Sequence, residues 1–151
     1  MRVTLNHDTA MYKLLRYCGI RYSDILNLEQ SDFNLNKKMI KVVSRKTNKT
    51  RYATIRPFDI DFFKLWFKTF KGKLFPFSLL QMRLHMKKFG GTHALRKELA
   101  NELQNMNWDD NLIRIKLGLF IEDPDNEIDK TALFKKIQEL ESQSFGDVVR
   151  Q

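Results

Sequence analysis

The chain is organised around the stretch Gly91-Thr92-His93-Ala94-Leu95-Arg96-Lys97-Glu98-Leu99-Ala100. The glycine pair ends the preceding segment, and Thr92 is a residue type that caps helices by accepting a backbone N–H bond. A helix predicted over 92–104 buries the leucines that recur at spacing four, Leu95, Leu99 and Leu103. His93 and Arg96 then share one face near the helix start, which suits a phosphate. An isolated His-x-x-Arg pair more often consists of ordinary surface residues of a helix. The rest of the sequence is therefore needed to distinguish a phosphate site from such a surface.

Composition favours a single basic domain. The chain has 151 residues, with 27 Lys and Arg against 18 Asp and Glu, a net charge of +9 and a pI near 9.7. This excess favours a polyanionic partner, although a generic basic protein would show the same charge. Cys18 is the single cysteine, which excludes an internal disulfide and a site built from several cysteines. The three histidines show no metal-ligand spacing, and no metal or cofactor is expected.

The first segment predicts two helices joined by a tight turn. An apolar stripe begins after Asp8-Thr9 and continues to Gly19, and Ser23-Asp24 opens a short second helix. Arg21 therefore lies on a turn between rigid elements. Asp24, three residues further on, is placed to orient Arg21 through a charge-assisted bond, although such a pair is most often only a surface pair.

A β-hairpin is predicted next. Residues 39–43 and 51–55 are rich in β-branched side chains, and the polar segment 44–50 between them is a hairpin tip. Lys46 and Lys49 lie at or near this tip. Lysines in such a place usually protect a sheet edge from pairing. The functional alternative is a lysine delivered into a DNA groove.

The remaining segments are mainly helical. Residues 32–36 are expected to form a polar turn, and further helices are predicted over 58–70, 78–89, 111–117 and 129–140. The apolar residues of the first of these helices are expected in the core rather than as a base-stacking platform: Phe62, Phe63, Leu65, Trp66 and Phe67. The second helix has an apolar side of Leu79, Leu80, Met82, Leu84 and Met86. Residues 122–127 form an acidic loop, and 142–151 a polar tail that is flexible or docked on a partner.

These elements predict a mostly helical α+β fold with a small β-hairpin or sheet on one side. No internal repeat or second domain is visible, so residues 1–151 are expected to form one domain. No apolar run is long enough to cross a bilayer, and no signal peptide is recognisable, which favours an intracellular protein.

The order of the elements resembles the catalytic domain of the tyrosine recombinases, the phage-integrase family. Four stretches, each weak alone, carry the resemblance in chain order: Tyr17–Leu28, Ser31–Asn34 followed by Arg45-Lys46-Thr47, Thr92–Arg96, and Ile115–Gly118. Together they span almost the whole chain at plausible distances. The resemblance implies the tyrosine-recombinase catalytic-domain fold and DNA integration and recombination within a virus or mobile genetic element.

The resemblance also implies a role for each matching residue. Arg21 and Arg96 would clamp the non-bridging oxygens of a phosphodiester. His93 would assist proton movement at the nucleophile or hydrogen-bond the phosphate, and Lys46 would protonate the departing 5′ oxygen. Asp24 would hold Arg21 from behind. The other basic residues of the hairpin are expected to contact DNA: Arg45, Lys49 and Arg51.

Two positions depart from the family pattern. Leu119 stands where a His or Trp usually follows the Leu-Gly pair. The family's nucleophile is a tyrosine in a later helix, often in a Thr-x-x-Tyr pattern, whereas this chain has no tyrosine after Tyr52 and has Phe134 at the matching place. Three explanations remain open: an engineered substitution, a natural loss of catalysis, or a different alignment in this region.

The resemblance leaves four functional classes to weigh. The first is a recombinase catalytic domain that forms a 3′-phosphotyrosyl intermediate and is disabled here by Phe134. The others are a type IB topoisomerase-like domain, a non-catalytic DNA-binding protein with a degenerate recombinase fold, and a helical transcription regulator. We expect the family's separate DNA-clamping domain to be absent. The expected partners are double-stranded DNA and further copies in a synaptic tetramer, through C-terminal residues Phe145, Val148 and Val149. The expected location is the cytoplasm of a prokaryotic host, for a chain encoded by that host, a virus or a plasmid.

Overall fold

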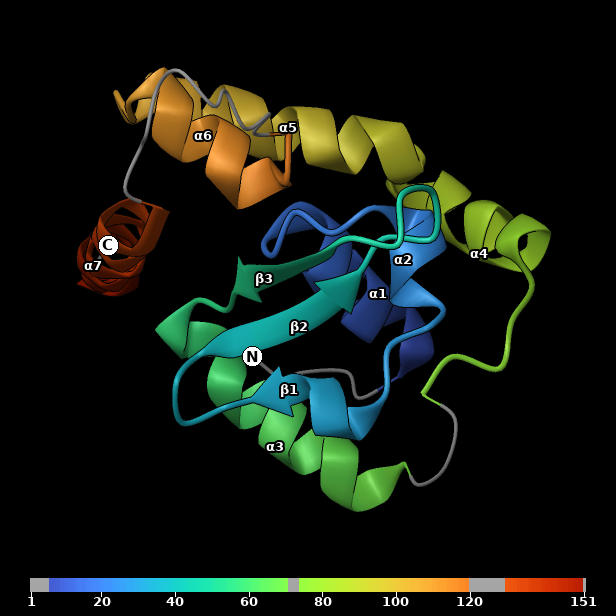
Figure 1. The fold of residues 1–151 in the computed structure, drawn as a ribbon. Helices are drawn as coiled ribbons and strands as arrows, with labels where there is room; N and C mark the ends of the chain where they lie inside the picture. The colour runs from blue at the N-terminus through green and yellow to red at the C-terminus, as the bar shows by residue number, and fades with distance from the viewer. Residues whose placement is uncertain (1–5, 71–73, 120–129, 151) are drawn as a thin grey trace.

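The structure is a computed structural model that describes residues 6–70, 74–119 and 130–150. It is mostly helical with one small antiparallel sheet, which confirms the predicted α+β class (Figure 1). In chain order the helices are α1 (His7–Arg16), α2 (Tyr22–Ile25), α3 (Ile60–Thr69), α4 (Leu79–Met86), α5 (Thr92–Asn105), α6 (Asp110–Leu117) and α7 (Lys130–Arg150). Short 3-10 turns occur at η1 (Gln30–Asp32), η2 (Pro57–Asp59) and η3 (Lys87–Phe89).

The sheet has one strand more than the predicted hairpin. Strands β2 (Met39–Val43) and β3 (Thr50–Thr54) pair antiparallel as expected, and β1 (Phe33–Asn34) adds to the outer side of β2. The prediction of a polar turn over 32–36 was therefore wrong at β1. The segment is too short and too polar for strand periodicity to show, and it becomes a strand only because β2 offers hydrogen-bonding partners.

Two hydrophobic clusters hold the fold together. The larger one joins α1, the sheet, α3 and α4 around buried Phe63 and Trp66, and the smaller one joins α5, α6 and α7. The predicted leucine stripe of α5 is buried and divides between them, with Leu95 in the larger cluster and Leu99 in the smaller. Helix α5 thus connects the sheet side of the molecule to its C-terminal helices. Leu65, which was expected in the core, is exposed, and so are Leu80 and Leu84 from the predicted apolar side of α4.

Helix α7 lies beside α6 at the side of the molecule opposite α2, α4 and the hairpin tip (Figure 1). Its buried anchors are Ile137 and Glu141. The helix continues across 142–150, where the sequence predicts a polar tail. The side chains of Phe145, Val148 and Val149 and the acidic loop at 122–127 lie outside the described residues.

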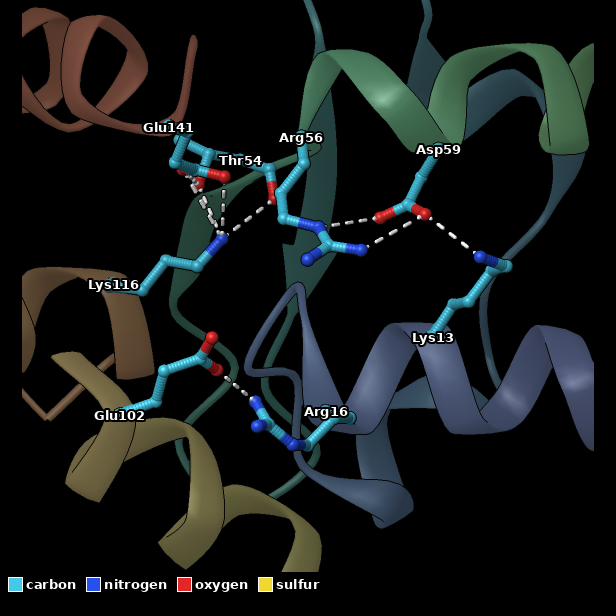
Figure 2. A network of polar contacts seen from close by, with 8 residues as sticks. All are labelled: Lys13, Arg16, Thr54, Arg56, Asp59, Glu102, Lys116 and Glu141. Carbon is cyan, nitrogen blue, oxygen red and sulfur yellow. Dashed lines mark hydrogen bonds and ion pairs between the residues drawn. The ribbon is translucent and has the colours of Figure 1, made fainter. Parts of the chain in front are cut away.

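A buried polar contact fastens α7 to the rest of the fold, and we call Lys116, Thr54 and Glu141 the α7 clamp (Figure 2). The Lys116 ammonium donates to the Thr54 hydroxyl at 2.7 Å and to both Glu141 carboxylate oxygens at 3.3 Å, and the Thr54 hydroxyl donates to Glu141. The clamp therefore ties α6 and β3 to α7 with every charge partnered.

Candidate functional site

Arg21 is presented by a turn that packs on the end of α6. It is the residue immediately before α2, in an extended conformation, and is half-buried. The turn depends on Gly19, whose φ is +69°, because a Cβ there would lie 3.0 Å from the Lys116 carbonyl and 3.2 Å from a Leu117 methyl. These contacts hold the turn that precedes Arg21 against the end of α6, although the two segments are far apart in the sequence.

Helix α5 brings Arg96 to the same place. Its guanidinium Nη2 donates to the Leu117 carbonyl, and its buried Nε makes no hydrogen bond with the described residues. His93 lies one turn earlier and is exposed, with its ring edge-on to Tyr22 at 6.1 Å between centroids. The prediction that Thr92 caps this helix was wrong: Thr92 is buried as the first helical residue, and Gly91 at φ +101° precedes it without a side-chain cap.

Arg51 joins this group from the sheet. Its Nη2 donates to the Gly19 carbonyl at 3.1 Å, and its side chain lies against Gly118, where a Cβ would come within 2.4 Å of Nε. The remaining nitrogen, Nη1, is buried and makes no hydrogen bond within the described part of the chain. We call Arg21, Arg51, Arg96 and Asp24 the arginine cluster.

The sequence predicts that Arg51 contacts DNA, and the structure shows that its guanidinium lies inside the fold rather than with the exposed basic residues of the hairpin. The missed signal is the strand register. Arg51 pairs with Val42, and Val42 is fully buried. Because paired residues of an antiparallel sheet point to the same face, Arg51 has to point inward with Val42.

The cluster is electrostatically unbalanced. The pKa of Arg96 is lowered to about 10, chiefly by burial and also by the charges of Arg21 and Arg51, while Asp24 opposes the shift. Burial likewise lowers the pKa of Arg51 to about 10, with Asp24 opposing and Arg21 adding to the shift. Each shift records the cost of holding a guanidinium away from water among like charges. An anion placed among these groups would relieve that cost.

Asp24 connects the cluster to the hairpin. Its buried carboxylate accepts a hydrogen bond at 3.1 Å from the backbone N–H of Arg45, not from the Arg21 guanidinium as the sequence suggested. This bond anchors one end of the turn that carries Lys46 and Lys49, both exposed. The hairpin is thus tethered to α2 within one residue of Lys46.

Two further positions were singled out from the sequence, Leu119 and Phe134. Leu119 follows α6 and is exposed. Phe134 is half-buried on α7, which packs mainly against α6 and η2. No hydrogen bond or ring contact of the described residues joins Phe134 to the arginine cluster, so the structure unites Arg21, Arg96, Arg51 and Asp24 and leaves Phe134 apart. Within the described ranges there is no cluster of His, Cys, Asp and Glu suited to a metal and no helix that could span a membrane.

Comparisons with known proteins point to integrases and recombinases. A sequence model of the phage integrase family matches residues 4–73. A probable integrase/recombinase of Acholeplasma phage L2 is 38% identical over 55 residues, which cover 36% of this chain and 19% of that protein. The shared stretch is about a fifth of that relative's length.

Two solved structures share the fold. A XerA recombinase superposes with a TM-score of 0.65 at 17% identity, covering 89% of this chain and 56% of that one. An integrase from mycobacterium phage Brujita also gives 0.65, at 16% identity, covering 78% and 44%. The fold is therefore that of integrases and recombinases. The matched sequence and the shared fold relate this chain to the phage integrase family, the tyrosine recombinases.

Proposed function

We propose that this chain is the DNA-phosphate-binding catalytic region of a site-specific recombinase. The observation that carries the proposal is the arginine cluster, in which three guanidinium groups converge with one buried carboxylate. Two of its buried N–H donors have no hydrogen-bond partner among the described residues. Buried donors of this kind are rare unless a ligand satisfies them. A DNA phosphodiester offers the anionic oxygens that such a group of arginines binds.

The cluster suits metal-free strand cleavage. In the proposed chemistry, Arg21 and Arg96 neutralise the charge that develops on the non-bridging oxygens. His93, exposed at the mouth of the cluster beside Tyr22, accepts or donates a proton at the attacked phosphate. Lys46, on the hairpin tethered through Asp24, protonates the leaving 5′ oxygen.

The attacking group in this scheme is a tyrosine at position 134. Phe134 lacks the hydroxyl oxygen, so the chain as it stands is proposed to bind DNA without forming a 3′-phosphotyrosyl bond. Phe134 makes no hydrogen bond or ring contact with the arginine cluster among the described residues, so the proposal includes a shift of α7 or delivery of the nucleophile from another copy. The latter fits the proposed self-association on DNA through the C-terminal segment.

Covalent trapping tests the proposal. The Phe134→Tyr variant is incubated with a nicked suicide duplex that carries the attachment site of its element, beside the unchanged chain and a Phe134→Tyr, Tyr22→Phe control. An adduct is expected with both chains that carry Phe134→Tyr and not with the unchanged chain. Adding Arg96→Ala should slow adduct formation by about 100- to 1,000-fold, the usual loss for one charge-stabilising donor. Undiminished cleavage without Arg96 would refute the assignment.

A second candidate is a DNA-binding protein of the same family without catalytic activity. Phe134 and the absence of any tyrosine after Tyr52 in the sequence favour it. Under this proposal the cluster still binds a phosphate, and Phe134→Tyr yields no adduct on DNA that the protein demonstrably binds. Retention of DNA binding with no adduct, also in a chain extended by the family's DNA-clamping domain, would favour this candidate.

A further inference from the structure

Arg51 stands at the junction of three segments that meet only in the folded protein. Its guanidinium donates to the Gly19 carbonyl, two residues before Arg21, and lies against Gly118, next to the Leu117 carbonyl that Arg96 holds. We propose that Arg51 is a positioning residue of the phosphate site, which sets the spacing between Arg21 and Arg96 and supplies a third positive charge. This inference rests on the proposed phosphate-binding function and assigns the site a member beyond its two clamping arginines.

The geometry explains why an arginine is needed at this position. A planar guanidinium donates in several directions while lying flat against a surface, whereas a lysine ammonium is a compact point charge on a flexible stem. Gly118 provides the flat surface, because any Cβ there would collide with the Arg51 side chain. Arg51 thus contacts two backbone segments at once, at Gly19 and at Gly118. A lysine at the same position would keep only the positive charge.

The charge pattern indicates that the third arginine acts on an anion. Nη1 of Arg51 and Nε of Arg96 are buried without hydrogen bonds among the described residues. The nearby acid, Asp24, already accepts the Arg45 backbone N–H. The indole N–H groups of Trp66 and Trp108 are also buried without partners, but an unpartnered donor of a charged guanidinium is costlier to bury than a neutral one. The unfilled donors and the excess of positive charge both favour a bound phosphate or sulfate group.

The hairpin supplies matched controls. Lys49 is two residues before Arg51, carries the same charge and is exposed. If Arg51 were one more diffuse DNA contact, Arg51→Met and Lys49→Met would weaken binding equally. If Arg51 organises the phosphate site, only its loss should affect binding of a small anion.

The experiment measures two properties of Arg51→Met, Arg51→Lys, Lys49→Met, Arg21→Met and Arg96→Met. The first is the rise in melting temperature caused by inorganic sulfate, and the second is affinity for a duplex oligonucleotide across a salt series. We expect Arg51→Met to lose more than about half of the sulfate-induced shift and to weaken DNA binding about tenfold. Arg51→Lys should recover part of both, and Lys49→Met should keep the sulfate effect and weaken DNA binding about twofold.

The outcomes separate the inference from the function on which it rests. If Arg51→Met and Lys49→Met behave alike while Arg21→Met and Arg96→Met lose the sulfate effect, Arg51 is not part of the site. If none of the four substitutions by methionine changes the effect of sulfate, the proposal of a phosphate site is itself wrong.

A second variant covers the case in which Arg51→Met fails to fold. Gly118→Ala displaces the Arg51 side chain and also strains a residue at φ +70°. Its effect on the sulfate shift should be larger than that of Gly91→Ala, which strains a residue at φ +101° where an added Cβ meets nothing within 4 Å. Equal reductions in the two variants would mean that backbone strain alone is responsible and would overturn the inference.

Discussion

The α7 clamp and the arginine cluster are both buried groups of charges, and they are built in opposite ways. In the clamp, one ammonium meets one carboxylate and one hydroxyl, and all three groups are hydrogen-bonded (Figure 2). In the cluster, three guanidinium groups share one carboxylate, and two N–H donors have no partner among the described residues. Buried charges that are all paired within the fold are typical of a contact that stabilises it. A buried excess of positive charge with unpartnered donors is typical of a site for a bound anion.

The neighbouring contacts support the same distinction. The Asp59 carboxylate accepts hydrogen bonds from Lys13 at 2.9 Å and from Arg56 at 3.0 Å (Figure 2). The Arg56 guanidinium also lies over the Tyr17 ring, 3.5 Å from its centroid. Asp59 is fully buried, as expected for a carboxylate that joins α1 to η2. In this group, as in the clamp, the carboxylate is directly paired with cations, so we interpret it as a contact that stabilises the fold.

The largest expected effect comes from breaking the clamp. Glu141→Ala leaves the Lys116 ammonium buried without its counter-ion, and we expect the free energy of unfolding to fall by about 3–5 kcal/mol. Urea denaturation followed by circular dichroism measures the loss. Glu139→Ala on the exposed face of α7 is the control, with little expected change. Equal effects of the two substitutions would remove the clamp from its structural role.

A smaller effect is expected when both charged partners are replaced together. Lys116→Met combined with Glu141→Leu removes the isolated charge, since apolar residues of similar volume often replace a buried ion pair without loss. The Thr54 hydroxyl and carbonyl then lose partners, so we expect destabilisation of about 2 kcal/mol or less. If the double variant were as unstable as Glu141→Ala, the loss in Glu141→Ala could not be explained by the unpaired Lys116 charge.

Cys18 allows a test of the electrostatics of the buried region between the two groups. Burial raises the pKa of its thiol to about 12 from the model-compound value of 9.0, with Lys116 opposing and Asp59 and Glu141 adding to the shift. Above pH 9 the unfolded chain therefore releases the thiol proton while the folded chain keeps it, so stability falls as pH rises. We expect the stability of the protein relative to Cys18→Ala to fall by about 1 kcal/mol per pH unit above about pH 9. A pH-independent difference would contradict the raised pKa.

Much of the fold could be predicted from the sequence, because the local patterns and the tertiary environment agree. The leucine stripe of α5, strand β2 and the inter-helix turn at Gly19 followed from spacing and residue type alone. Leu65, Leu80 and Leu84 were misplaced because an apolar residue on a helix does not reveal which face has a neighbour. Strand β1 and the helical continuation of α7 were missed because their few residues carry no clear period.

The site was only partly predictable for a related reason. Sequence motifs pointed to Arg21 and Arg96, but the contacts of Gly19 and Arg96 with Leu117 depend on long-range packing. Asp24 illustrates the same limit: its spacing suggested a bond to Arg21, whereas the fold presents it with the Arg45 backbone. Arg51 could have been found from the strand register, given the buried Val42 opposite it.

The smallest expected effect concerns the exposed hairpin. Lys46 lies one residue from the anchored Arg45 amide, yet its side chain is exposed and takes no part in either buried group. We therefore expect Lys46→Ala to change the free energy of unfolding by no more than about 0.5 kcal/mol. The same substitution in the Phe134→Tyr background should slow covalent trapping by about 100-fold or more, since a general acid contributes that much to leaving-group departure. A duplex whose leaving 5′ oxygen is replaced by sulfur, which needs no protonation to depart, should restore the rate to Lys46→Ala but not to Arg96→Ala. If sulfur restores neither variant, Lys46 is not the acid, and Lys49 on the same hairpin becomes the residue to test.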